Sequence, residues 1–167
     1  NIATAMCDSV EEVYHGKVNR DIVIAGVLLH DIFKLVSYVV RDDGSYDSSP
    51  LADRLDHISI AVAELHRRRF PLALIHVVCA HHGDFSPVRP RTIEALICHL
   101  ADYMDSQLNG KILKAAKYLT RKALHEEIGR LTSEEAFAIV ASKTAGGWDE
   151  VIKTVKRIKQ KRTAHKT

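Results

Sequence analysis

A histidine and an aspartate stand side by side at His30-Asp31, at the end of the apolar run formed by residues 22–29. Because that run is apolar enough to be buried, it brings two polar side chains to the edge of a hydrophobic core. An ionised carboxylate in such a place requires a strong partner, which can be a cation, an arginine or a helix N-terminus. The chain favours the cation because it supplies further nitrogen and oxygen ligands at His57, His81, His82 and Asp102.

The rest of the chain is patterned for helices. Only 8 of the 167 residues are Gly and 4 are Pro, so the apolar patterns run for long stretches without a break. A chain of this length is the size of one ordinary domain and can bury a real core. We find no internal repeat and no dividing linker, and therefore expect one all-α, single-domain helical bundle over residues 1–167, with a basic helix and tail at 148–167.

Capping and breaking residues place the expected helices. Asn19 can cap a helix that we expect to reach about Val40, because roughly twenty residues follow without a proline. A capping box at 132–135 opens another helix, which we expect to end at Gly146-Gly147. The other helices are expected over 2–14, from 50 or 56 to 69, and over 71–82, 92–108, 111–125 and 148–161, with a loop at 41–50.

Composition excludes several classes of protein. The net charge of +3 is mild and does not require a polyanionic partner. Three cysteines, an odd number without a C-x-x-C pair, indicate neither a zinc knuckle nor a disulfide framework. No apolar run reaches membrane-spanning length and no signal peptide opens the chain, so we expect a cytoplasmic protein with no membrane partner.

The polar residues of interest fall on different expected helices, at helix ends or beside loops. Helical bundles build metal sites in this way, from side chains on facing helices. Imidazole and carboxylate together suit divalent ions such as zinc, iron, manganese or magnesium. Asp31 could bridge two ions, and a two-metal site can both activate water and stabilise the leaving oxygen of a phosphoester.

Three basic residues are candidates for binding a phosphate. Lys34 lies four residues after His30 on the same helical face, and can meet a phosphate oxygen as a point charge. Arg89 and Arg91 flank Pro90 in the loop that follows the paired histidines and could do the same.

Each residue also has a purely structural interpretation. His30-Asp31 could form a buried hydrogen bond, while Asp102 and Lys34 could be solvated helix residues. Two adjacent histidines at 81–82 are harder to bury without a shared ligand, so the set as a whole favours a metal site. One turn before Asp102, His99 could orient that carboxylate.

In their order along the chain, these motifs resemble the HD-domain superfamily of metal-dependent phosphohydrolases. The motifs are LLHDIFK with His30-Asp31, then His57, then His81-His82 with Gly83, then HLADYMDSQL with Asp102. The resemblance covers about residues 1–115, and the segment 81–108 is most similar to HD domains of bacterial 3′-to-5′ exoribonucleases that act on single strands.

The resemblance implies one or two divalent ions, with manganese, iron, magnesium, nickel and zinc not distinguished. In members with two ions, it implies that His30 and Asp102 hold the first and that Asp31 bridges to the second. The second ion would be held by His57, His81 and His82.

The chain departs from the family pattern in places. The HD stretch usually ends in Gly-Lys, and Phe33 here replaces the glycine, which is expected to narrow the approach to the site. Counting back places a further metal-binding histidine of the family at Asn1 or before the chain begins. Nothing resembles the oligonucleotide-binding β-barrel that precedes the exoribonuclease HD domain, so a small nucleotide is as plausible a substrate as an RNA end.

We therefore consider three functions. The first is a metal-dependent phosphohydrolase of the nucleotidase, phosphodiesterase or exoribonuclease type, with Asp31 and Lys34 catalytic and Lys34, Arg89 and Arg91 binding a nucleotide or single-stranded nucleic acid. The second is a regulatory HD module that binds metal or nucleotide without cleavage, and the third is a structural helical domain. Two explanations account for the basic residues of the tail: positive charge is favoured at a helix C-terminus by the helix dipole, or the tail binds nucleic acid. The sequence does not decide whether the protein forms a homo-oligomer.

Overall fold

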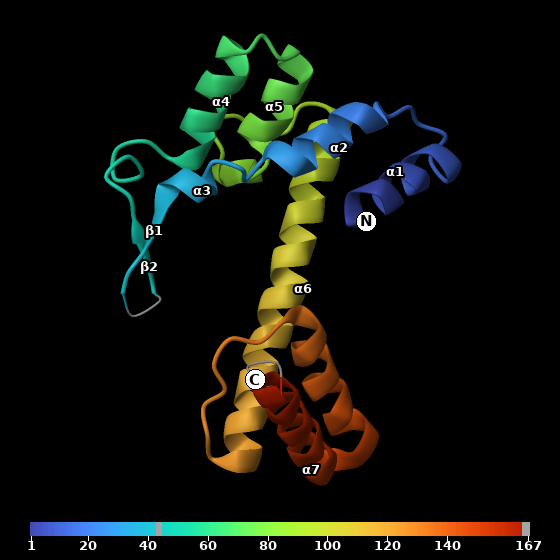
Figure 1. Cartoon of the computed structure of the whole chain (residues 1–167). Coiled ribbons are helices and arrows are strands. Elements are labelled where there is room, and N and C mark those ends of the chain that lie inside the picture. The colour runs from blue at the N-terminus through green and yellow to red at the C-terminus, as the bar shows by residue number, and fades with distance from the viewer. Residues whose placement is uncertain (43–44, 165–167) are drawn as a thin grey trace. The chain divides into compact units, whose positions relative to one another are not determined.

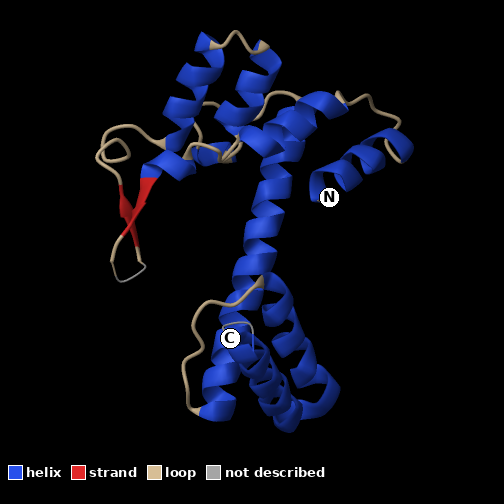
Figure 2. Cartoon of the chain, viewed as in Figure 1, coloured by secondary structure: helices blue, strands red, loops and turns tan. Residues whose placement is uncertain are grey.

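The computed structural model describes residues 1–42 and 45–164, and nearly all of its secondary structure is helical (Figures 1 and 2). The expected all-α fold is confirmed. The helices are α1 (Ile2–Glu12), α2 (Arg20–Leu29), α3 (Lys34–Ser37), α4 (His57–Arg67), α5 (Leu72–Ala80), α6 (Ile93–Leu124) and α7 (Ser133–Ala164). A 3-10 helix, η1 (Gly83–Phe85), and a hairpin of β1 (Tyr38–Val40) and β2 (Tyr46–Ser48) complete the elements of the described residues. Two parts of our expectations, the loop at 43–44 and the tail at 165–167, lie outside the described residues.

Contacts divide the chain into two compact units, residues 1–104 and 105–167, and helix α6 belongs to both. The first unit holds α1 to α5, the hairpin and the start of α6. The second holds the remainder of α6 and all of α7. A single domain over residues 1–167 stays a prediction.

In the first unit, α2 and α5 approach each other closely at Gly26. A Cβ atom at this buried glycine would lie 2.4 Å from Cγ1 of Val77, which is fully buried on α5. Only a residue without a side chain permits that approach. The close contact matters for the site, because His30 and Asp31 follow the end of α2 and the paired histidines follow the end of α5.

The helix expected from Asn19 to Val40 is wrong in its second half. Asn19 does cap α2, with its Oδ1 accepting the backbone N–H of Ile22 at 3.2 Å. The helix then stops at Leu29. Beyond it, the backbone N–H of Lys34 donates to the carbonyl of Asp31 at 2.9 Å, an i→i+3 hydrogen bond of the kind that forms a turn tighter than an α-helix. The β-branched residues at 39–40 then pair with β2 in an antiparallel hairpin.

The expected division into two helices, 92–108 and 111–125, is also wrong, since one helix, α6, runs from Ile93 to Leu124 through Asn109-Gly110. A glycine inside a helix costs only about 1 kcal/mol relative to alanine, which neighbouring turns of a long helix can offset. The helices observed in the place of the other expected segments differ from the expectation mainly at their ends.

In the second unit the expected capping box is confirmed. The backbone N–H of Thr132 donates to Oε2 of Glu135 at 2.8 Å, and the N–H of Glu135 donates to Oγ1 of Thr132 at 3.2 Å. The predicted interruption at Gly146-Gly147 is present as a kink within α7, and Gly147 has a φ of 67°, which favours glycine. The bases of the last helix are partly used inside this unit, where Lys159 pairs with Glu126 and Arg162 with Glu135.

Among the described helices, none combines the length and the apolar character that a membrane crossing requires.

Candidate metal centre

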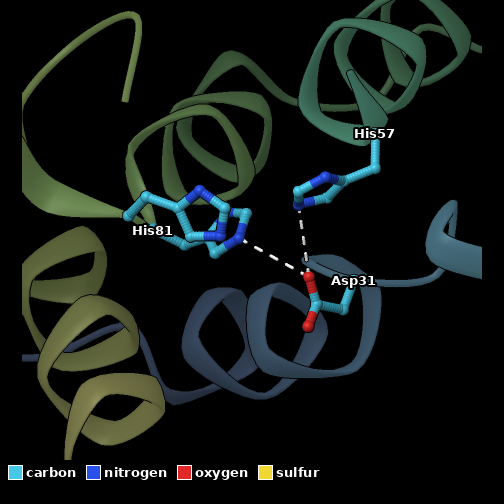
Figure 3. Close-up of side chains that lie close together, drawn as sticks. Asp31, His57 and His81 are labelled. Atoms are coloured by element: carbon cyan, nitrogen blue, oxygen red, sulfur yellow. Dashed lines mark ion pairs between the residues drawn. The ribbon is translucent and has the colours of Figure 1, made fainter. Parts of the chain in front are cut away.

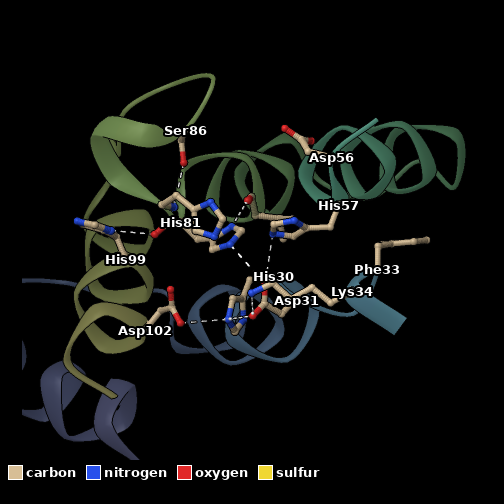
Figure 4. A network of polar contacts seen from close by, with 12 residues as sticks. His30, Asp31, Phe33, Lys34, Asp56, His57, His81, Ser86, His99 and Asp102 are labelled. Atoms are coloured by element: carbon tan, nitrogen blue, oxygen red, sulfur yellow. Dashed lines mark hydrogen bonds and ion pairs between the residues drawn. The ribbon is translucent and has the colours of Figure 1, made fainter. Parts of the chain in front are cut away.

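The ligands expected from the sequence converge in the first unit (Figure 4). They come from four places on the chain: the ends of α2 and α5, the start of α4, and the body of α6. His30 and Asp31 follow α2, His57 opens α4, the paired histidines follow α5, and Asp102 lies on α6. Their donor atoms form two groups, each within 4.8 Å: Asp31, His57, His81 and His82 in one, and His30, Asp31 and Asp102 in the other.

Asp31 is the residue that both groups share. Its Oδ1 lies 3.4 Å from Nε2 of His57 and 3.7 Å from Nε2 of His81 (Figure 3). Its Oδ2 lies 3.5 Å from Nε2 of His30 and 2.7 Å from Nζ of Lys34. His30 Nε2 in turn lies 3.6 Å from Oδ1 of Asp102, which completes the second group. One carboxylate therefore faces three imidazole nitrogens and an ammonium group.

Two of the imidazoles are oriented by their own helices. Nδ1 of His81 lies 2.7 Å from the carbonyl oxygen of Val78, and Nδ1 of His30 lies 2.9 Å from that of Val27. A carbonyl can only accept, so Nδ1 must carry the proton in both rings. The Nε2 lone pairs are thereby directed at the shared space, as metal-ligating histidines require.

Three buried polar atoms at the centre have no hydrogen-bond partner among the residues that the structure describes. These are Oδ1 of Asp31, Nε2 of His57 and Nε2 of His81. Each buried polar group without a partner lowers the stability of the fold by about 1–3 kcal/mol. A cluster of three such atoms therefore indicates a ligand that they bind together. Two atoms held about 2.1 Å from a common ion lie about 3–3.5 Å apart, close to the separations seen here. The donors, their orientation and their spacing fit a divalent cation.

The charges of the site also suit a cation. Burial opposes ionisation of Asp31, but its interactions with His81 and Lys34 outweigh burial and hold its pKa below the ordinary value. Burial, reinforced by neighbouring positive groups, lowers the pKa values of His57 and His82, which keeps them neutral and able to ligate.

The residues of the His30 group influence each other. Burial works against protonation of His30, but Asp102 and Asp31 raise its pKa overall. The interaction with His30 lowers the pKa of Asp102 despite partial burial. This group therefore holds two carboxylates that remain ionised at neutral pH.

The three basic candidates are placed differently. Lys34 contacts Asp31 directly, as noted above. Arg89 lines a cavity of about 490 Å³ that begins at His82, and its Nε lies 2.9 Å from Oδ1 of Asp84. Arg91 is exposed and does not line this cavity, while its backbone N–H donates to Nε2 of His76 at 3.0 Å.

Two expectations about neighbouring residues are corrected. Phe33 does not narrow the approach, because its side chain points away from the cluster (Figure 4) and packs against apolar residues of α4 and α5. His99 does not orient Asp102; its Nδ1 donates instead to the backbone carbonyl of His81 at 2.8 Å. The glycine that follows the paired histidines makes this contact possible, since a Cβ atom at Gly83 would lie 2.5 Å from the His99 ring. That glycine was the only sequence signal for the contact.

The all-α fold and this cluster define an HD domain, and comparison with known families agrees. The HD domain family matches residues 1–107, and the chain belongs to that family. HD domains bind divalent metal ions, and the cluster described above could hold one.

Curated relatives fall in two groups. The chain is 48% identical over 120 residues to the dihydroneopterin 2′,3′-cyclic phosphate phosphodiesterase of Methanocaldococcus jannaschii, which covers 72% of this chain and 48% of that protein. It is 35% identical over 125 residues to the 3′-5′ exoribonuclease YhaM of Listeria monocytogenes, covering 67% and 39%, and 32% identical over 120 residues to YhaM of Bacillus subtilis, covering 65% and 36%. The chain thus spans less than half the length of each of these relatives. No solved structure matches it.

Proposed function

We propose that the chain is the catalytic part of a metal-dependent phosphohydrolase that cleaves a phosphodiester in a nucleotide-like compound or a single-stranded nucleic acid. The observation that carries the proposal is the trio of unpartnered buried atoms around Asp31, which a divalent cation would satisfy together. The relatives are named as a cyclic phosphate phosphodiesterase and as exoribonucleases, and both activities cleave phosphodiesters.

In this proposal His57, His81 and His82 hold one ion, His30 and Asp102 hold another, and Asp31 lies between them. The ions supply Lewis acidity and lower the pKa of bound water. The ligand set has four imidazoles and two carboxylates, which favours manganese, iron, nickel or zinc over magnesium.

Lys34 supplies a positive charge that is not a ligand. Its ammonium group rests on Oδ2 of Asp31 at 2.7 Å, and its side chain is 39% exposed, so it can turn to a phosphate oxygen. A point charge there stabilises the negative charge that develops as the phosphodiester is attacked. Arg89 lines the cavity beside His82 and could bind another part of the substrate there. Arg91 and a nucleic-acid role for the basic tail stay predictions, as do a cytoplasmic location and a homo-oligomer.

The test is hydrolysis of bis-p-nitrophenyl phosphate and of nucleoside 2′,3′-cyclic phosphates by protein reconstituted with manganese. We expect turnover by the unmodified protein and its loss in Asp31→Ala, together with loss of bound metal measured by elemental analysis. Asp53→Ala removes an exposed carboxylate outside the cluster and should change neither. Full activity in Asp31→Ala would refute the proposal.

One observation favours the alternative, a module that binds without cleaving. The His30 group offers a single imidazole and shares one of its two carboxylates with the other group, which makes it the weaker site. Stoichiometric metal with tight nucleotide binding and no hydrolysis of any of these substrates would establish that alternative.

A further inference from the structure

The cavity beside the metal centre is lined by rings. It has a volume of about 490 Å³, within the range of small-molecule sites. His82, Phe85, His99 and Tyr103 contribute four rings to its lining, and two leucines of α6 line it as well. Because His82 also belongs to the ligand group around Asp31, one substrate could fill the cavity and reach the metal centre.

We propose that this cavity binds the planar heterocycle of the substrate, and that it selects a ring with a 2-amino-4-oxopyrimidine edge, as in pterins and guanine. The proposal rests on the proposed function, in which the phosphodiester lies at the metal centre. The proposal concerns the heterocyclic part of the substrate, which would not contact the ions.

The rings supply a surface for stacking. Phe85 is 93% exposed on η1, so its phenyl ring contributes almost nothing to the core and is available to a ligand. The His99 ring is fixed in orientation by its hydrogen bond to the carbonyl of His81. Aromatic side chains bind bases through their faces, whatever the base, so stacking explains why a heterocycle fits but not which one.

The choice of ring comes from Asp84 and Arg89, which both line the cavity. Their side chains are 75% and 78% exposed and pair at 2.9 Å. Such an exposed pair is weak, so each group can exchange its partner for a ligand. A carboxylate accepts N–H bonds and a guanidinium donates to a carbonyl oxygen.

A 2-amino-4-oxopyrimidine edge presents the matching groups. Its ring N–H and amino group are donors for Asp84, and its carbonyl oxygen is an acceptor for Arg89. Adenine lacks the carbonyl and has an acceptor nitrogen in place of the ring N–H, which leaves both side chains mismatched. Unmatched polar groups in a binding site are the strongest source of discrimination between similar ligands.

The backbone after α5 creates this arrangement. Gly83 has a φ of 62° and packs against the His99 ring, so the chain turns sharply between His82 and Asp84. The turn directs one residue to the metal ligands and the next ones to the cavity.

The experiment measures binding of neopterin, guanosine and adenosine to the purified protein, by quenching of pterin fluorescence and by calorimetry. We expect neopterin or guanosine to bind about tenfold tighter than adenosine. The Asp84→Asn substitution should weaken binding of the preferred ligand about fivefold or more. Phe85→Ala should weaken all three ligands. The matched controls are Asp53→Asn and Tyr14→Ala, which change an exposed carboxylate and an exposed ring outside the cavity.

Each outcome decides the proposal. Tight binding of neopterin alone, or of guanosine alone, supports it and names the source of the ring. Equal affinity for adenosine, or an Asp84→Asn variant that behaves like Asp53→Asn, overturns it. Because these ligands carry no phosphate, their binding is independent of turnover, so an absence of phosphodiesterase activity would refute the proposed function alone.

Discussion

Replacing Gly26 by alanine should push apart the two helices whose ends carry four of the proposed metal ligands. The new Cβ would lie 2.4 Å from Cγ1 and 3.3 Å from Cβ of Val77, while carbon atoms ordinarily pack at about 3.5–4.0 Å. Val77 is fully buried and cannot move into solvent. Overpacking of this kind costs about 1–3 kcal/mol, and the gain in helix propensity returns about 1 kcal/mol. Because a contact of 2.4 Å places the cost in the upper part of that range, at about 2–3 kcal/mol, we expect Gly26→Ala to lower the free energy of unfolding by about 1–2 kcal/mol.

The second variant, Val77→Ala, removes the atom that would clash. Alone it deletes two buried methyl groups and should cost about 2 kcal/mol. In the double variant the Cβ introduced at position 26 occupies space that the valine side chain has left, so the two costs should not add. We expect the double variant to be more stable than the sum of the single variants by at least about 1 kcal/mol.

Urea unfolding followed by circular dichroism measures all four free energies, and cobalt titration reports the metal centre in the same proteins. Since the rings of His30 and His81 lie with their centroids 4.9 Å apart across α2 and α5, Gly26→Ala should weaken metal binding and the double variant should recover it. Strictly additive free energies, or a Gly26→Ala protein of unchanged stability and metal affinity, would refute the reasoning.

Three further predictions concern single side chains. Cys98 is fully buried, and its pKa is raised to about 12, mainly by burial and to a smaller extent by nearby carboxylates. We therefore expect Cys98 and the buried Cys7 to react with Ellman's reagent only as fast as the protein unfolds. Thr132→Ala removes the capping box of α7 and should lower the stability of the second unit by about 1 kcal/mol, whereas Thr132→Ser should restore it in thermal unfolding. The Asp56 carboxylate accepts the backbone N–H of Ser59 at 2.6 Å, which lowers its pKa; its stabilisation is complete above the ordinary Asp pKa of about 3.9 and is lost as the pH falls. The cost of Asp56→Ala, about 1 kcal/mol at pH 7, should therefore shrink in unfolding measured near pH 3, and a cost that stays constant would contradict this assignment.

The ligand set was accessible from the sequence because burial constrains it. His30, Asp31 and the histidines at 81–82 adjoin apolar runs, and polar groups carried to the edge of a core require partners. The caps at Asn19 and Thr132 were predicted for a similar reason, since helix ends leave backbone groups that a specific side chain must satisfy. The structure brings all six expected ligand residues into two groups, and their roles as ligands stay a proposal.

The errors arise where backbone conformation, not composition, decides. No glycine or proline marks the end of α2 at Leu29, and i→i+3 bonds that end a helix leave no trace in hydrophobic spacing. In the opposite direction, Asn109-Gly110 has the composition of a break, yet α6 continues through it. The contact of His99 with the His81 carbonyl depends on a positive φ at Gly83, two positions removed from the residue that it holds.

That contact links the two halves of the proposed substrate site. His99 fixes the backbone of His81, whose Nε2 faces Asp31, and the same ring lines the cavity beside His82. A ligand that contacts the His99 ring would therefore also contact the residue that is hydrogen-bonded to the backbone of His81, one of the proposed metal ligands. The family motif of two histidines and a glycine thus has a physical reason at each position. One imidazole is buried and directed at Asp31, the next stands between the centre and the cavity, and the glycine leaves room for the ring that holds them in place.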